Sequence, residues 1–484
     1  MSKPRPTSPP PPTSKPVRAE AQIEGKPIKP GSIATFADAT AALLQHVDLE
    51  KLRPTPEVRH QYKLDRMRAL LVAMGNPHEA LRCVHVAGTK GKGSTCEMIA
   101  TCLEACGYTV GLYTSPHLVD IRERFRINRR PITEETFVTL AKGVLKAAAG
   151  LEKEHGLATF FELTTAMAFQ FFADEAVDVA VVEVGLGGLL DCTNVITPEV
   201  AAVTLIGRDH MQILGDTLEE IALQKAGIIK PGVPALTVPQ DPAAAKVIRE
   251  YAGKVNAPLA MIGEEIEFSH RFEFPPGEAP VLRLNLTTER NDYDQIAVPL
   301  RGEQQAANCA LALAVIDKLA ERGFQCPQER VLEGLARTKL EGRFELINSS
   351  PRILLDGAHN PESMRALMKA IGQYVQYDAL LVIFGCAADK EFRPMLQALA
   401  MAADKVVFTA AGSNARAAKP EELQRVYREL SDKDSHVAPT LADALAIARP
   451  SVNREDLVCI TGSFYLVGEA KKMHAARAAA SRKS

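Results

Sequence analysis

The chain contains no tryptophan, and only 5% of its residues are aromatic. This scarcity argues against a platform of stacked aromatic rings for single-stranded nucleic acid. The 57 Lys+Arg residues are balanced by 59 Asp+Glu, so the formal net charge is −2. A near-neutral chain lacks the strong overall field of proteins that coat nucleic acid or an anionic membrane. We therefore expect neither nucleic acid nor a membrane as a partner.

Long apolar runs are also missing. No segment approaches the roughly 20 apolar residues of a membrane-spanning helix, and the longest run, at 379–388, is typical of a buried strand. The nine cysteines include no Cys-x-x-Cys pair, and the N-terminus has no apolar segment of a secretory signal. These absences favour reduced thiols and a cytoplasmic location.

The first 31 residues are instead rich in proline, with four in succession at 9–12. Such a composition predicts a disordered leader in an extended or polyproline conformation. Helical periodicity begins after residue 32, and a second series of strand and helix patterns begins after a boundary near 338–342. We therefore expect two folded domains, at 32–338 and at 339–484.

Strand and helix patterns alternate in both parts of the chain. In the first part, apolar strands at 83–87, 110–113, 177–182 and 200–205 are separated by helical patterns. This alternation predicts a mostly parallel sheet covered by helices on both faces. Between 262 and 300 the strands become short and alternating, which predicts a small antiparallel appendage. A second strand–helix series after 342 predicts a Rossmann-like α/β domain, so the fold class is α/β throughout.

A glycine-rich segment follows the strand at 83–87 and opens directly onto a helix. It consists of Gly88, Thr89, Lys90, Gly91, Lys92, Gly93 and Ser94. Backbone N–H groups in such a loop can point at an anion, and the helix N-terminus adds positive potential. Lys92 would supply a charge for the β- and γ-phosphates of a nucleotide. The strict pattern G-x-x-x-x-G-K-[ST] is not met, because Val86 occupies the first position and Gly93 follows the lysine. We nevertheless predict a phosphate loop.

Three polar residues near strand ends could bind the Mg²⁺ that accompanies a nucleotide. Ser115 follows the strand at 110–113, Glu183 ends the next strand, and His210 lies soon after the strand at 200–205. Ligand sites of open α/β sheets gather at the carboxyl ends of parallel strands. Mg²⁺ prefers oxygen ligands and tolerates an occasional imidazole. Taken singly, each residue is equally well explained as a turn, a strand end or a surface histidine.

Together these motifs resemble the folylpolyglutamate synthase/dihydrofolate synthase family of the Mur ligase superfamily. The segments that carry the resemblance, all in family order, are 85–94 (HVAGTKGKGS), 112–126 (LYTSPHLVDIRERFR), 160–165 (FFELTT), 182–194 (VEVGLGGLLDCTN), 209–215 (DHMQILG), 225–232 (KAGIIKPG), 342–345 (GRFE), 356–361 (DGAHNP) and 461–465 (TGSFY). The resemblance implies an ATP-dependent ligase that adds L-glutamate to a folate through an acyl phosphate, and to dihydropteroate as well.

The resemblance also implies roles for individual residues. Lys92, Lys225 and His359 would be catalytic, with Lys225 carbamylated and helping to hold a second Mg²⁺. Asn308, Arg343 and Asp356 would contact the nucleotide together with the phosphate loop, and the first Mg²⁺ would be bound by Ser115, Glu183 and His210. Leu189 departs from the pattern, because many members have Arg there. We expect a monomer whose second domain faces the phosphate loop.

Two alternatives stay open at this point. Another Mur-type ligase would act on a cell-wall precursor, but only about 55 residues separate the leader from Gly88, too few for a domain that binds a nucleotide sugar. A non-catalytic nucleotide switch would need the phosphate loop but not a second α/β domain. Glutamate-dependent release of phosphate would exclude this switch.

Overall fold

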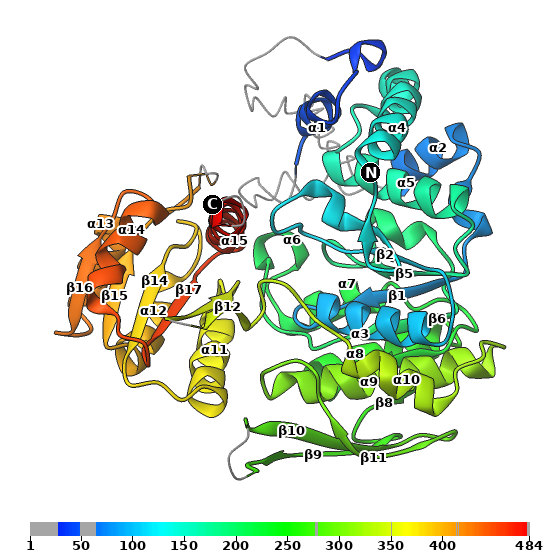
Figure 1. Cartoon of the computed structure of the whole chain (residues 1–484). Helices are drawn as coiled ribbons and strands as arrows, with labels where there is room; N and C mark the ends of the chain where they lie inside the picture. Colours follow the sequence, from blue (N-terminus) through cyan, green and yellow to red (C-terminus); the bar gives the residue numbers. More distant parts are fainter. Residues whose placement is uncertain are drawn as a thin grey trace, which may run out of the picture.

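The computed structural model describes residues 28–48, 64–275, 279–349, 351–412, 414 and 416–481. Most of the predicted leader, residues 1–27, lies outside the described residues. The described chain forms two α/β bodies around separate sheets, which stand side by side in Figure 1. The predicted boundary at 338–342 falls between the last helix of the first body and the first strand of the second.

The first body is built on an eight-stranded sheet. Its strands, in spatial order, are β4 (Arg130–Pro131), β3 (Phe125–Ile127), β2 (Val110–Tyr113), β5 (Val179–Glu183), β1 (Cys83–Ala87), β6 (Val200–Val203), β7 (Ala235–Thr237) and β8 (Leu259–Met261). From β2 to β8 all neighbouring strands are parallel, and β3 and β4 add an antiparallel edge. The predicted mostly parallel sheet is confirmed.

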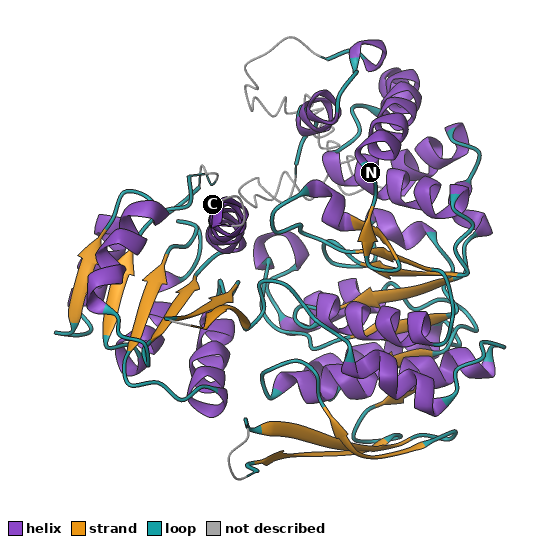
Figure 2. Cartoon of the chain, viewed as in Figure 1, coloured by secondary structure: helices purple, strands orange, loops and turns teal. Residues whose placement is uncertain are grey.

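Helices cover both faces of this sheet, as Figure 2 shows. They are α1 (Phe36–Leu44), α2 (Leu64–Ala73), α3 (Lys92–Ala105), α4 (Glu134–His155), α5 (Phe160–Asp174), α6 (Met211–Leu214), α7 (Leu218–Ala226), α8 (Pro242–Lys254), α9 (Gln304–Glu321) and α10 (Gln328–Ala336). Short 3₁₀ turns are η1 (Pro30–Ser32), η3 (Pro77–Ala80), η4 (Ile121–Arg124) and η5 (Cys192–Val195).

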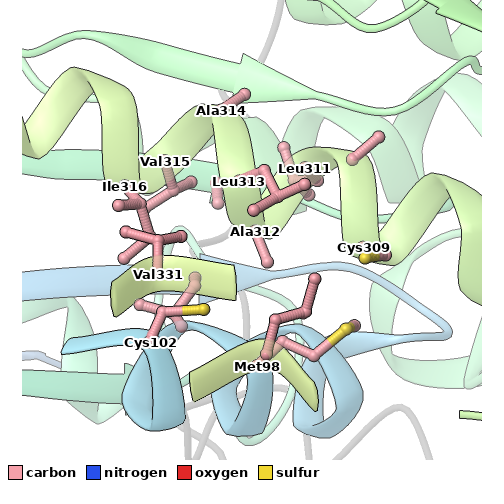
Figure 3. Close-up of a cluster of buried hydrophobic side chains, with 14 of the residues drawn as sticks. Met98, Cys102, Cys309, Leu311, Ala312, Leu313, Ala314, Val315, Ile316 and Val331 are labelled. Atoms are coloured by element: carbon pink, nitrogen blue, oxygen red, sulfur yellow. The ribbon is translucent and has the colours of Figure 1, made fainter. Parts of the chain in front are cut away.

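Successive residues of the central strands enter different cores. In β5, Val179 and Val181 pack with α3, α9 and α10, whereas Ala180 and Val182 pack with α4 and α5. Figure 3 shows the first of these cores, where Met98 and Cys102 of α3 lie against α9 and against Val331 of α10. Because both faces are buried, the strand reads as a continuous apolar run.

The appendage is a three-stranded antiparallel sheet of β9 (Glu267–Glu273), β10 (Val281–Thr287) and β11 (Asp292–Ala297). Every second residue of β10 is buried, at Leu282, Leu284 and Leu286, and these side chains join the core of α9. This one-sided burial explains the alternating pattern that predicted the appendage.

The second body has a six-stranded sheet in the order β12 (Glu345–Ser349), β13 (Arg352–Asp356), β17 (Leu457–Thr461), β14 (Leu380–Phe384), β15 (Lys405–Phe408) and β16 (Asp434–Val437). All pairs are parallel except β12 with β13. Its helices are α11 (Pro361–Tyr374), α12 (Phe392–Ala402), α13 (Pro420–Arg428), α14 (Leu441–Ala448), η6 (Arg449–Ser451) and α15 (Phe464–Ser481). Among the described helices, none is long and apolar enough to span a membrane.

Candidate active site

The glycine-rich loop connects the end of β1 with the start of α3. Gly88 has a φ of 146°, and a Cβ there would lie 1.8 Å from Thr204 Oγ1. Gly91 has a φ of 93°, and a Cβ there would lie 2.3 Å from Asn308 Oδ1. Only glycine satisfies both the backbone conformation and the lack of space at these positions.

Part of the loop is tied to the chain that follows β6. The N–H groups of Thr89 and Lys90 donate to the carbonyl oxygen of Leu205, at 2.9 and 3.1 Å. These two groups therefore do not point at an anion. The sequence analysis had expected all the N–H groups of the loop to do so, and for these two that expectation is wrong. The donors for an anion come instead from the N-terminus of α3, whose first N–H groups have no acceptor within the helix.

Two lysines meet at the first residue of the loop. Lys92 Nζ donates to the carbonyl oxygen of Gly88 at 3.3 Å, and Lys225 Nζ donates to the same oxygen at 2.9 Å. Lys225 comes from the last turn of α7 and is only 4% exposed. Burial, and then the neighbouring charge of Lys92, lower the pKa of Lys225 to about 7. Its amine is therefore partly neutral at physiological pH.

Oxygen ligands for a cation lie beside the start of α3. Glu183, 4% exposed, accepts a hydrogen bond at 3.0 Å from the N–H of Ser115. A Cβ on Gly93 would lie 3.7 Å from Glu183 Oε2, so the carboxylate reaches the phosphate loop. Ser94 on the same turn adds a hydroxyl. This set of hard oxygen donors fits Mg²⁺.

His210, the third predicted metal ligand, lies at the N-terminus of α6 with a φ of 51°. Its side chain is 45% exposed, and Nε2 lies 3.8 Å from Asp209 Oδ1. His210 lines the same cleft as Ser115 and Glu183. In the described part of the chain, no three His, Cys, Asp or Glu side chains are grouped closely enough to hold a metal. A metal bound at this edge would therefore need ligands such as the serine hydroxyls.

Helix α9 supports the loop from behind. Asn308 Nδ2 donates to Gln305 Oε1 at 3.0 Å, and Gln305 Nε2 donates to Ser94 Oγ at 3.3 Å. Both α9 side chains are buried. The structure thus places the predicted nucleotide residue Asn308 at the loop and adds Gln305, which the sequence analysis missed because no motif marks it.

The second body contributes Arg343, Asp356 and His359. The Asp356 carboxylate accepts hydrogen bonds from the N–H groups of Phe344 and Ala358, at 2.9 and 2.8 Å. Burial raises the pKa of Asp356 and lowers that of Arg343. The guanidinium of Arg343 lies over the ring of Phe464, 4.4 Å from its centroid.

The His359 ring is held by a hydrogen bond to the backbone two residues before it. Its Nδ1 lies 2.8 Å from the carbonyl oxygen of Gly357, so Nδ1 carries the proton and donates to that oxygen. Burial, and then the charge of Lys390, lower the pKa of His359 to about 4. The imidazole is therefore neutral at pH 7, with Nε2 available as an acceptor.

Two ion pairs join the bodies across the site. Lys90 of the phosphate loop pairs with Glu362 in the first turn of α11, and Lys390 Nζ lies 3.9 Å from Asp209 Oδ1. The sequence analysis did not select Glu362, Lys390 or Asp209 as site residues. Asp209 adjoins the predicted His210, but nothing local marks the other two, because their partners lie in the other body.

All the predicted site residues except Gly88 and Lys225 line one cleft of about 2240 Å³ between the bodies. Lining residues include Lys92, Ser115, Glu183, Asn308, Arg343 and His359. Lys225 lies beneath the loop through its bond to Gly88. Single ligand pockets usually measure about 300–1,000 Å³, so the cleft has room for several substrates.

Comparison with known proteins agrees with this arrangement. Residues 86–316 match the Mur ligase middle domain, and residues 342–464 match the Mur ligase glutamate ligase domain. The dihydrofolate synthase/folylpolyglutamate synthase of Bacillus subtilis is 35% identical over 412 residues, covering 84% of this chain and 94% of that protein. The chain belongs to the folylpolyglutamate synthase/dihydrofolate synthase family.

Two further members of the family are similar over nearly their whole length. The folylpolyglutamate synthase of Lacticaseibacillus casei is 36% identical over 413 residues, covering 84% of this chain and 93% of that protein. The solved structure of Mycobacterium tuberculosis folylpolyglutamate synthase complexed with ADP aligns with a TM-score of 0.80 and 32% identity. That alignment covers 91% of this chain and 98% of the other.

Leu189, which departs from the family pattern, lies where the turn after β5 contacts the end of α7. Its N–H donates to the carbonyl oxygen of Gln224 at 2.7 Å. A Cβ on Gly227 would lie 2.5 Å from Leu189, so the chain approaches α7 closely here. The leucine thus packs the turn after β5 against the end of the helix that carries Lys225.

Proposed function

We propose that the chain is an ATP-dependent ligase that joins the amino group of L-glutamate to a carboxylate of a folate. One observation carries this proposal: the phosphate loop with Lys92, supported from beneath by Lys225, forms one side of the cleft, and Arg343, Asp356 and His359 form the other. The relatives named above, which are folylpolyglutamate synthases, support the same activity.

The chemistry requires activation of the folate carboxylate. A carboxylate is a poor acyl donor, because its oxygen does not leave as an oxide. Transfer of the γ-phosphoryl group of ATP to that oxygen gives an acyl phosphate and ADP. The glutamate nitrogen then attacks the acyl carbon, the C–O bond to phosphate breaks, and an amide, inorganic phosphate and a proton are the products. Holding three substrates in one cleft supplies much of the rate.

In the first step, two anions must approach each other. We assign Lys92 and the N-terminus of α3 to the β- and γ-phosphates, because opposite charge lowers their repulsion. Ser115, Glu183 and His210 would hold Mg²⁺, with Ser94 beside them. Bound there, the metal would supply further neutralisation of the triphosphate charge. Asn308, Arg343 and Asp356 would also contact the nucleotide.

In the second step, the amine must be positioned rather than strongly deprotonated by a side chain. A histidine with a pKa of about 4 is a weak base, but His359 Nε2 can still accept a hydrogen bond. We assign His359 to orienting the substrate near the reacting carbon. The Phe464 ring contacts both His359 and Arg343, so the two side chains lie near each other. The charge of Arg343 can therefore stabilise the tetrahedral intermediate.

Lys225 has the properties required for carbamylation. Its amine is buried and has a pKa of about 7, so the neutral form that attacks CO₂ is well populated. Attack forms an N–C bond, and the nitrogen loses one proton to give a carbamate anion. We propose that this anion helps to hold a second Mg²⁺. Intact-protein mass spectrometry in bicarbonate would detect it, and a Lys225→Ala variant with full activity in bicarbonate-free buffer would contradict its role.

The decisive experiment measures phosphate release with ATP, Mg²⁺ and glutamate, offering tetrahydrofolate and dihydropteroate separately. We expect release with both acceptors, only when glutamate is present, together with a glutamylated product identified by mass spectrometry. Product from one acceptor would reject the dual activity. ATP hydrolysis without glutamate would favour a nucleotide switch, and activity only with a cell-wall nucleotide sugar would favour another Mur ligase.

We further propose that the enzyme is a cytoplasmic monomer. All nine cysteines are free thiols, which suits a reducing compartment. The two walls of the cleft come from a single chain, so the site is complete without a second copy. Light scattering at micromolar concentration tests the monomer, and a stable dimer would contradict it.

A further inference from the structure

Leu118 belongs to the first body but packs into the second. It lies in the loop between β2 and η4, directly after His117. Its side chain nevertheless contacts the hydrophobic core that surrounds α14 and α15 of the second body. The loop that carries the predicted metal ligand Ser115 is therefore attached directly to the other body.

Two glycines of the second body make this contact possible. A Cβ on Gly468, in the second turn of α15, would lie 2.1 Å from the carbonyl oxygen of Leu118. A Cβ on Gly342, where φ is 67°, would lie 3.0 Å from Leu118 Cδ2. The obstacle at Gly468 is backbone, which cannot rotate away as a flexible side chain can. Helix α15 thus fits against the loop because residue 468 has no side chain.

The loop around Leu118 is internally rigid. The Glu123 carboxylate accepts hydrogen bonds from the N–H groups of Leu118, Val119 and Asp120, at 2.7, 2.9 and 2.7 Å. Arg124, which is almost completely buried, donates from Nε to His117 Nδ1 at 2.9 Å. Displacement of Leu118 must therefore move the whole loop rather than one side chain.

This rigidity extends to the metal ligands. Only Pro116 and His117 separate Leu118 from Ser115, and the Ser115 N–H bonds to Glu183. We infer that Leu118 is a positioning residue: by packing against Gly342 and Gly468 it holds the Ser115 loop in the arrangement that binds the metal–nucleotide complex when the second body is docked. The inference rests on the proposed function for the role of Ser115.

The test compares four variants in Mg²⁺ titrations of binding to a fluorescent, non-hydrolysable ATP analogue. Leu118→Ala removes the packing, and Gly468→Ala forces the loop carbonyl away from α15. We expect both to raise the Mg²⁺ concentration for half-maximal binding about 5- to 10-fold, at the lower end of the usual coupling between sites. Leu118→Met, which keeps the apolar contact, should restore the requirement to within about twofold.

Gly372→Ala is the matched control for Gly468→Ala. Gly372 is also a helical glycine of the second body, but no described atom lies within 4 Å of a Cβ built there. This variant should bind as the wild type does. Normal Mg²⁺ requirements for both Leu118→Ala and Gly468→Ala would overturn the inference, and if Gly468→Ala does not fold, Leu118→Ala decides alone. A wild type that binds the analogue but forms no glutamylated product would reject the proposed function and not this inference.

Discussion

Lys225 Nζ lies 2.9 Å from the carbonyl oxygen of Gly88, although 137 residues separate them in the chain. Lys92 Nζ donates to the same oxygen at 3.3 Å. A single carbonyl therefore brings two lysines to the point where the phosphate loop begins. Burial, and then the charge of Lys92, lower the pKa of Lys225 and favour the neutral form of its amine.

Lys225→Met should stabilise the protein, and more strongly at pH 6 than at pH 8. The folded-state pKa is depressed from 10.5 to about 7, so between these values the unfolded chain binds a proton that the folded chain does not. The free energy of unfolding of the wild type must then rise with pH, by about 1.4 kcal/mol per unit above pH 7. Below pH 7 the buried charge carries its full penalty, which methionine removes.

Urea denaturation of both proteins in CO₂-free buffer at pH 6, 7 and 8 measures this effect. The advantage of Lys225→Met should shrink by roughly 1 kcal/mol between pH 6 and pH 8. An advantage that stays the same at all three pH values would show that Lys225 does not titrate in this range.

Lys92→Met should lower kcat/KM for glutamate-dependent phosphate release about 100-fold or more, because in the proposed function Lys92 is the cation assigned to the transferred phosphoryl group. The fold should remain, since the side chain is only partly buried. Lys246→Met is the control, because that lysine lies exposed on α8. Steady-state kinetics and circular dichroism together test the prediction, and a loss below about fivefold for Lys92→Met would contradict it.

Glu183→Gln should raise the Mg²⁺ requirement of the reaction about tenfold or more. Glutamine keeps the shape and can still accept the hydrogen bond from Ser115, but it lacks the negative charge that attracts a cation. Activity measured over a range of Mg²⁺ concentrations at saturating ATP checks this expectation. Glu250→Gln, an exposed carboxylate on α8, serves as the control and should leave the titration unchanged.

Gly88→Ala and Gly107→Ala separate backbone strain from lack of space. Both glycines have positive φ, of 146° and 95°, but no described atom lies within 4 Å of a Cβ at Gly107. Gly107→Ala should therefore cost about 1–2 kcal/mol of stability and leave nucleotide binding intact. Gly88→Ala also overlaps Thr204, so it should cost more and weaken nucleotide binding severalfold. Chemical denaturation and titration with an ATP analogue measure the two effects, and equal behaviour of the variants would refute the distinction.

The elements that the sequence predicted best are those with sharp local boundaries. The strands at 83–87 and 110–113 have the predicted limits in the structure. Glycine follows β1 directly and ends it, because Gly88 adopts a φ of 146°. Strands buried on both faces were equally clear, because nearly all their residues are apolar, with His85 in β1 and Glu183 at the end of β5 as exceptions.

The elements that the sequence analysis missed are short or lie at edges. The β3–β4 hairpin contains three arginines, and β16 is half exposed, so neither shows an apolar run. Strand β7 has only three residues, too few for a recognisable period. These strands exist because neighbouring strands offer hydrogen bonds, a contribution that composition does not reveal.

The sequence by itself determined the α/β class, the phosphate loop and the polar residues that end the parallel strands. These features depend on neighbours within a few residues, such as glycine freedom, alternation and helix capping. Only the tertiary structure decided that Lys225 shares a carbonyl with Lys92, that Glu362 pairs with the phosphate loop, and that Leu118 enters the second body. Such contacts join segments distant in the chain, and they depend on which buried faces pack together.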